Sequence, residues 1–277
     1  MSSSSDYKYV YPKGWDENIL IVTSLPGTTV TLSKTTSQSY TFGSGETIHS
    51  FNLNDGYGDY TVEASINGTT QTYNFSNTFV GLHEMTAYVI SKTLESNSWS
   101  IISAASSNDI GQSLWSIGDK KSVRINGTVN GYSYDTTLYV FITDFAHNVS
   151  VEGTGICFQG FKDASGKDVA MCAPNYSQSS QPTGFVMNLS NITDGGWEAS
   201  RMRKTIIPEF KNALPSDLVS NIKTTTIWTH NTTGGRDNNS DSNVTATQET
   251  VYLLAEFEIF GSRAYANQYE QNHQTQY

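Results

Sequence analysis

Tyr60-Thr-Val-Glu-Ala-Ser-Ile-Asn-Gly-Thr-Thr-Gln-Thr-Tyr-Asn-Phe75 is the stretch that decides the fold of this chain. Its centre, Asn67-Gly68, is the preferred pair for a two-residue type I′ turn, in which both residues need a positive φ. A hairpin closed by that turn sets two pairs across one face: Tyr60 with Phe75, and Val62 with Tyr73. The turn and the alternation therefore predict the same antiparallel hairpin with one apolar face.

Strand patterns continue on both sides of this hairpin. Ile19-Leu-Ile-Val22 is a short apolar run that ends at the turn signal Leu25-Pro-Gly27, and a further strand is expected over residues 84–90. Roughly six or seven short strands in this region predict an immunoglobulin-like β-sandwich over residues 16–92. Residues 1–15 are polar with interleaved tyrosines, and we expect a flexible arm or a docking strand there.

Residues 93–277 change character and predict a second, α+β domain. Helices are expected over residues 99–105, capped by Asn97, and over residues 197–204 and 209–222. The apolar run 138–142 predicts a strand buried on both faces, residues 249–260 a second strand, and residues 230–247 a long loop. The fold class expected for the whole chain is therefore mainly β with some α.

Composition agrees with a β-rich protein and excludes two classes of partner. Only 15% of the 277 residues are charged, whereas Tyr (16) and Gly (22) are frequent, as in short strands joined by tight turns. A net charge of −10 without a basic run excludes nucleic acid and an anionic membrane surface as partners. The N-terminal residues lack the pattern of a signal peptide, so synthesis in the cytosol without export is expected.

Two cysteines, Cys157 and Cys172, flank a predicted hairpin centred on Ala164-Ser165. That hairpin brings them opposite one another, where a cross-strand disulfide is geometrically conceivable. Two reduced, buried thiols in facing strands are the alternative, and a cytosolic origin favours them.

Chemistry-bearing motifs are scarce, so no enzymatic activity is expected. Glu256 and Glu258 are two apart on the predicted strand, about 6.5–7 Å apart at the backbone, a spacing compatible with glycoside hydrolysis. Phe257 and Ile259 alternate with them, which is equally typical of a half-buried strand with a polar outer face. The five histidines are scattered without metal-ligand spacing, and no nucleophile elbow or phosphate-binding loop is present.

One loop weakly resembles a calcium site. Asp237, Asn239 and Asp241 follow the Asp-x-Asn-x-Asp beginning of a calcium-binding loop. The sixth position is Ser242 where glycine is wanted, and the twelfth is Gln248 instead of glutamate. A solvated loop is therefore the favoured interpretation, and no cofactor is expected apart from this weak calcium candidate.

A ligand-binding face, if present, is expected where aromatic residues meet polar loops. Flat aromatic rings cover the apolar faces of sugars while polar side chains bind the hydroxyls. The candidates are Trp228, His230, Tyr265 and Tyr269. Ordinary packing of these rings is the alternative, and burial in the core is the preferred interpretation of Trp115 and Trp197.

Six short motifs occur in order in the second half of the chain. They are Trp115-Ser-Ile-Gly-Asp119, Val123-Arg-Ile-Asn-Gly127, Asp144-Phe-Ala-His147, Gly195-Gly-Trp-Glu-Ala-Ser-Arg-Met-Arg203, Leu214-Pro-Ser-Asp-Leu218 and Tyr252-Leu-Leu-Ala-Glu-Phe-Glu-Ile-Phe-Gly261. Together, over residues 95–277, they resemble an uncharacterised domain family common in phages and gut Firmicutes. The preceding domain is similar to the immunoglobulin-like modules of phage structural proteins.

This resemblance implies a C-type-lectin-like fold in the C-terminal part, as in some phage receptor-binding proteins. Members of the family usually continue into a Trp-Leu-Arg-Ser-Pro segment, which this sequence lacks. The resemblance therefore assigns no ligand residues.

Three functional hypotheses follow from these observations. The first is a non-enzymatic virion protein (head fibre, decoration or tail protein) that forms a homo-oligomer, contacts other virion proteins and displays a domain for host or mucosal glycans. The second is a bacterial cell-surface carbohydrate-binding protein. The third is a glycan-active enzyme that uses Glu256 and Glu258.

Overall fold

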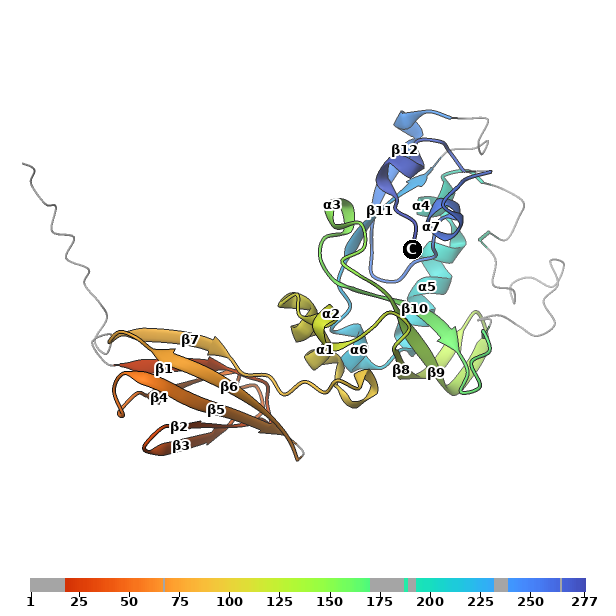
Figure 1. The fold of residues 1–277 in the computed structure, drawn as a ribbon. Coiled ribbons are helices and arrows are strands. Elements are labelled where there is room, and N and C mark those ends of the chain that lie inside the picture. Colours follow the sequence, from red (N-terminus) through yellow and green to blue (C-terminus); the bar gives the residue numbers. More distant parts are fainter. Residues whose placement is uncertain (1–17, 67, 170–186, 189–192, 232–238, 265) are drawn as a thin grey trace, which may run out of the picture. The chain divides into compact units, whose positions relative to one another are not determined.

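The computed structural model describes residues 18–66, 68–169, 187–188, 193–231, 239–264 and 266–277 (Figure 1). The chain divides between Ser91 and Lys92 into two compact units. Its fold is mainly β with some α, which confirms the predicted fold class. The arm predicted at residues 1–15 lies outside the described residues. In the described part of the chain, no helix has the length and apolar character needed to cross a membrane.

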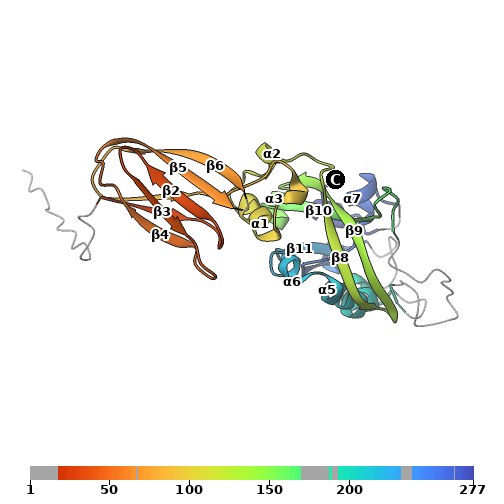
Figure 2. The ribbon, with the colours of Figure 1, turned by 90° about the horizontal axis from the view of Figure 1, so that it is seen from below.

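The described residues of the first unit form seven strands in two sheets. Figure 2 shows strands β2, β3, β5 and β6, which belong to one of these sheets. The three-stranded sheet has the order β4-β1-β7, with β1 parallel to β7, and the four-stranded sheet has the order β3-β2-β5-β6. The strands are β1 (Ile19–Thr23), β2 (Thr29–Ser33), β3 (Ser37–Thr41), β4 (Ile48–Asn52), β5 (Gly58–Ile66), β6 (Thr69–Asn77) and β7 (Leu82–Thr86).

The hairpin of β5 and β6 has the predicted register. Tyr60 pairs with Phe75 and Val62 with Tyr73, and Gly68 has φ +79° in the turn. The apolar face of the hairpin enters a core to which both sheets contribute, with Leu20, Val22, Val30, Phe51 and Val62 at most 2% exposed. Two sheets closing on one apolar layer make this unit a β-sandwich.

A three-stranded and a two-stranded sheet, flanked by short helices, form the second unit. The strands are β8 (Lys120–Val129), β9 (Tyr132–Phe145), β10 (Ile156–Lys162), β11 (Thr225–His230) and β12 (Val244–Glu249), in the orders β10-β9-β8 and β11-β12. The helices are α1 (Trp99–Ser107), α2 (Gly111–Leu114), α3 (Val149–Glu152), α4 (Gly196–Ala199), α5 (Ile207–Ala213), α6 (Ser216–Val219) and α7 (Glu256–Phe260). Tighter or wider helical turns complete the unit: η1 (Leu94–Ser96), η2 (Met202–Ile206), η4 (Asp241–Asn243) and η5 (Glu270–His273).

Several local expectations for the second unit are close to the structure. The helix expected over residues 99–105 is α1, but its cap is Ser98, whose side chain accepts from the Ile101 N–H, and Asn97 lies one residue outside. The predicted helices 197–204 and 209–222 correspond to the shorter elements α4, η2, α5 and α6. In β9 the run 138–142 is buried on one face and half-buried on the other.

Residues 249–260 do not form the predicted strand. Strand β12 ends at Glu249, and Glu256–Phe260 is the helix α7. The first turn of this helix contains two acidic residues, and Gly261, with φ +65°, follows its last residue. Both features are typical of helix ends, and they outweigh the alternation of apolar residues over so short a stretch. Glu256 and Glu258 therefore do not share a strand face.

The predicted loop 230–247 is also shorter than expected. Val244–Glu249 pairs antiparallel with Thr225–His230, so both ends of the expected loop belong to a sheet. Residues 232–238 lie outside the described part. The polar residues of β12, which are two threonines, a glutamine and a glutamate, did not indicate a strand in the sequence. Its partner in the sheet is β11.

Cys157 lies on β10 and is half-buried with a free thiol. Burial raises the pKa of that thiol. Cys172 lies outside the described residues.

Candidate functional site

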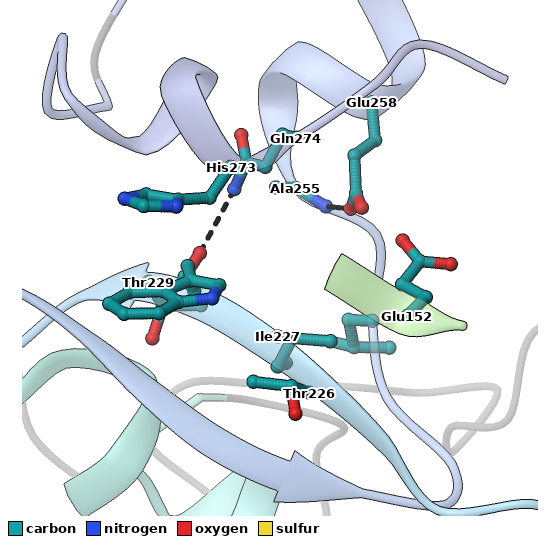
Figure 3. Close-up of a pocket in the computed structure, with 10 residues that line it drawn as sticks. Glu152, Thr226, Ile227, Thr229, Ala255, Glu258, His273 and Gln274 are labelled. Carbon is teal, nitrogen blue, oxygen red and sulfur yellow. Dashed lines mark hydrogen bonds between the residues drawn. The ribbon is translucent and has the colours of Figure 1, made fainter. Parts of the chain in front are cut away.

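A small recess with a cavity volume of about 10 Å³, partly open to solvent, lies between β11 and the segment that follows β12 (Figure 3). Strand β11 supplies four consecutive residues, 226–229, and the end of helix α3 supplies Glu152. The later segment supplies the rest: Leu253, Ala255, Glu258, His273 and Gln274. Residues far apart in sequence therefore meet in one small, mostly polar site.

One end of the recess is aromatic. The indole of Trp228 stacks on the imidazole of His273, with ring centroids 4.1 Å apart and planes inclined by 11°. Gln274 Nε2 donates to the carbonyl oxygen of Trp228 at 3.1 Å, which fixes the segment beside the strand. The hydroxyl-bearing residues Thr226 and Thr229 line the same recess. This end combines a flat ring surface with hydrogen-bonding groups.

The other end is acidic. The carboxylates of Glu152 and Glu258 point toward one another (Figure 3), and both side chains are buried. Glu258 Oε2 accepts from the Ala255 N–H at 2.7 Å, and both Glu152 oxygens lie 3.1 Å from His147 Nδ1. Each carboxylate is thus already bound within the fold.

Burial gives these acids unusual protonation behaviour. Loss of water around the carboxylate raises the pKa of Glu152 and of Glu258. The nearby charge of Glu152 raises the pKa of Glu258 further, whereas the Ala255 N–H opposes that shift. The protonated form of each acid is therefore favoured more in this site than it is in water.

His147 connects the acidic end to the segment 273–277. Its side chain is 1% exposed, its ring stacks on Tyr277 with centroids 3.6 Å apart, and its Nε2 lies 2.9 Å from the carbonyl oxygen of Thr275. A carbonyl oxygen only accepts hydrogen bonds, so Nε2 carries the hydrogen in this contact. Tyr277 adds a backbone bond, from its N–H to the carbonyl oxygen of Glu258 at 3.0 Å.

Of the four predicted ligand-binding residues, Trp228 alone is placed in this recess. His230 and Tyr269 are half-buried and do not line it, and Tyr265 lies outside the described residues. The backbone N–H of His230 donates to Glu270 Oε1 at 2.5 Å, and burial lowers the pKa of the His230 imidazole. His230 and Tyr269 therefore lie close to the chain segment that follows β12 but do not line the recess.

Two residues of the weak calcium candidate have roles in the local structure of the loop. Asn239 Oδ1 accepts from the Gln268 N–H at 2.9 Å, and Asp241 begins the turn η4. Asp237 lies outside the described residues. Among the residues that the structure describes, no group of three or more His, Cys, Asp or Glu side chains is placed to hold a metal ion.

Sequence reasoning missed most of the site. Glu258 faces Glu152 instead of acting beside Glu256, whose carboxylate accepts from the N–H groups of Ala264 and Ala266 at 2.7 and 3.0 Å. Trp228 and Gln274 are 46 residues apart, and His147 and Thr275 are 128 apart. The motif that ends at His147 and the motif that contains Glu258 were the sequence signals for this end of the site.

Compared with protein-family models, with curated proteins and with solved structures, the chain matches none of them.

Proposed function

We propose that this protein is a non-enzymatic glycan-binding module displayed on a bacteriophage particle. The observation that carries the binding part is the aromatic end of the recess, where Trp228 and His273 stack beside Thr229 and Gln274. Aromatic rings cover the apolar face of a sugar, and hydroxyl and amide groups bind its hydroxyls. Host-surface and mucosal glycans are the proposed ligands.

The non-enzymatic part is supported by how the acids are used. Glu258 accepts from Ala255 and Glu152 is bound to His147, so the carboxylates already have partners within the fold. The recess is also small: its cavity volume of about 10 Å³ is far below that of typical ligand pockets, which span roughly 300–1,000 Å³. A glycan bound at the aromatic end would meet rings and amides before it met a carboxylate.

The virion setting is supported by the ordered set of motifs that resembles a phage domain family. We propose a head fibre, decoration or tail protein that forms a homo-oligomer among other virion proteins. Mass spectrometry of purified phage particles tests this, with the protein expected in stoichiometric amount. Its absence from the particles together with its presence in the bacterial envelope would favour the alternative, a bacterial cell-surface carbohydrate-binding protein.

Binding is tested on an array of host-wall and mucin glycans with the Trp228→Ala variant. We expect the wild type to bind a subset of glycans and W228A to lose up to about tenfold in affinity, since an aromatic contact contributes about 0.5–1.5 kcal/mol. Tyr57→Ala is the matched control, because Tyr57 is a 62% exposed aromatic residue in the first unit. Equal binding by W228A and the wild type would remove Trp228 from the site.

A glycan-active enzyme is the second candidate, and the facing carboxylates of Glu152 and Glu258 are the observation that favours it. Two buried acids with a raised pKa can divide acid and base roles across a glycosidic bond. Turnover on a glycan panel that disappears in Glu152→Gln and Glu258→Gln would establish it. No turnover by the wild type would leave the binding function alone.

A further inference from the structure

The segment 273–277 lines the recess with His273 and Gln274 and is attached to the rest of the unit at two places. At the aromatic end, His273 covers one face of the Trp228 indole, and Gln274 bonds to the Trp228 carbonyl. At the acidic end, the Thr275 carbonyl oxygen is bound to His147, and Tyr277 stacks on the same imidazole. The ring that the proposed function needs is therefore partly covered by a segment fixed on an ionisable pair.

The attachment at His147 requires a proton between His147 Nδ1 and Glu152. Because Nε2 donates to Thr275, a neutral imidazole presents the lone pair of Nδ1 to the carboxylate. The contact is then attractive only if Glu152 is protonated, or if the imidazole carries both hydrogens and pairs with an ionised Glu152. Loss of that one shared proton leaves a lone pair of the imidazole against an acceptor oxygen: the Glu152 carboxylate at 3.1 Å or, in the other tautomer, the Thr275 carbonyl at 2.9 Å.

We propose that the segment 273–277 is a pH-dependent cover over Trp228, closed while His147 and Glu152 share a proton and released as the pH rises. The cover is a regulatory property of the recess. Its consequence for ligand binding rests on the proposed function, whereas the opening itself does not.

The surroundings of the pair favour release at higher pH. Glu258 faces Glu152 from helix α7, and Asp144 on β9 and Glu270 on η5 add negative charge nearby. Tyr252, Tyr277 and the thiol of Cys157 are half-buried beside the pair and uncharged at neutral pH. Arg263, near Glu270, acts in the opposite direction.

The raised pKa values of Glu152 and Glu258 decide whether the segment is released at high or at low pH. A carboxyl group whose pKa is raised in the closed form contributes stability that is complete below its ordinary pKa, near 4.5. That contribution is lost as the pH passes the raised value. One linked proton changes the ratio of open to closed segment by up to about tenfold per pH unit.

Amide hydrogen exchange followed by mass spectrometry tests the cover in the full chain. Protection factors of the peptide that contains residues 273–277, corrected for the intrinsic pH dependence of exchange, are compared at pH 5 and pH 8. We expect at least a tenfold loss of protection at pH 8 in the wild type. An unchanged protection factor would overturn the proposal.

The Glu152→Gln/Glu258→Gln variant supplies the charge test. The side-chain amide introduced at position 152 donates a hydrogen to His147 Nδ1 at either pH, and the amide oxygen introduced at position 258 still accepts from the Ala255 N–H. The protection of this variant is therefore expected to stay within about twofold between pH 5 and pH 8. Glu84→Gln, at an exposed acid of the first unit, is the matched control and should behave as the wild type. A double variant that loses protection as the wild type does would also overturn the proposal.

Glycan binding separates this inference from the proposed function. His273→Ala removes the ring that covers Trp228, so binding at pH 5 should increase toward the wild-type value at pH 8. Opening detected by exchange without any glycan ligand would contradict the proposed function and leave the cover established. Glycan binding that depends on Trp228 but not on pH, together with unchanged hydrogen exchange, would support the proposed function and contradict the cover.

Discussion

Glu270 shows how a single buried acid can make the stability of this protein depend on pH. It is 7% exposed, and its carboxylate accepts from the backbone N–H of His230. Burial raises its pKa, with the neighbouring charge of Glu256 acting in the same direction and the His230 N–H against both. The folded protein therefore disfavours the ionised form relative to water.

We expect Glu270→Gln to stabilise the protein at pH 8 and to have little effect at pH 4.5. The raised pKa means that Glu270 contributes stability below its ordinary pKa and loses it as the pH rises through the folded value. Glutamine keeps the acceptor for His230 without the charge, so a higher melting temperature than that of the wild type is expected at pH 8. Thermal melting at both pH values measures it, with Glu63→Gln, an exposed acid, as the control. A variant less stable than the wild type at pH 8 would contradict the sign.

Helix α4 and strand β11 meet at a contact that only glycine permits. A Cβ placed on Gly196 would lie 1.9 Å from the carbonyl oxygen of His230, and Gly196 has φ +51°. The contact brings the helix that carries Trp197 against the strand that carries Trp228. The position of the recess strand thus depends on the absence of one methyl group.

Gly196→Ala should therefore destabilise the second unit by more than its backbone strain alone. The strained φ costs about 1 kcal/mol, and displacing the His230 backbone adds about 1–3 kcal/mol. Gly131→Ala is the matched control, because Gly131 has φ +79° with nothing within 4 Å of the added Cβ. Chemical denaturation compares the two, and equal losses would show that β11 moves without cost.

The first unit has a hydrophobic core of its own. Every residue of the sandwich core lies between Leu20 and Val89, and Val62 at its centre is fully buried. Calorimetry of the full chain is therefore expected to show two transitions.

Val62→Ala should lower only one of these transitions, since it removes about 1–2 kcal/mol of buried apolar contact from the sandwich alone. Thr128→Ala, a surface change in β8, is the control. A parallel shift of both transitions by V62A would mean that the units unfold together.

The sequence by itself determined the local structure, that is, features set by residues close to one another in the chain. The hairpin 60–75 could be predicted to the register because a turn residue pair and a period of two act within a few residues of each other. The mixed, mainly β fold class and the expected burial of Trp115 and Trp197 followed from the same kind of signal, and both are confirmed. Over residues 249–260 the local signals conflicted, and the helix signals at Glu256, Glu258 and Gly261 prevailed over the alternation.

What only the tertiary structure decided was the site. Trp228 could be named from its type and its place beside a polar loop, but nothing near it in sequence indicated His273 as its stacking partner. The acidic end joins Glu152 with Glu258, and His147 with Thr275, from elements that the chain brings together only when its sheets and helices pack. Burial raises the pKa of both acids, and burial is a property of the packed molecule that a linear pattern of residues does not contain.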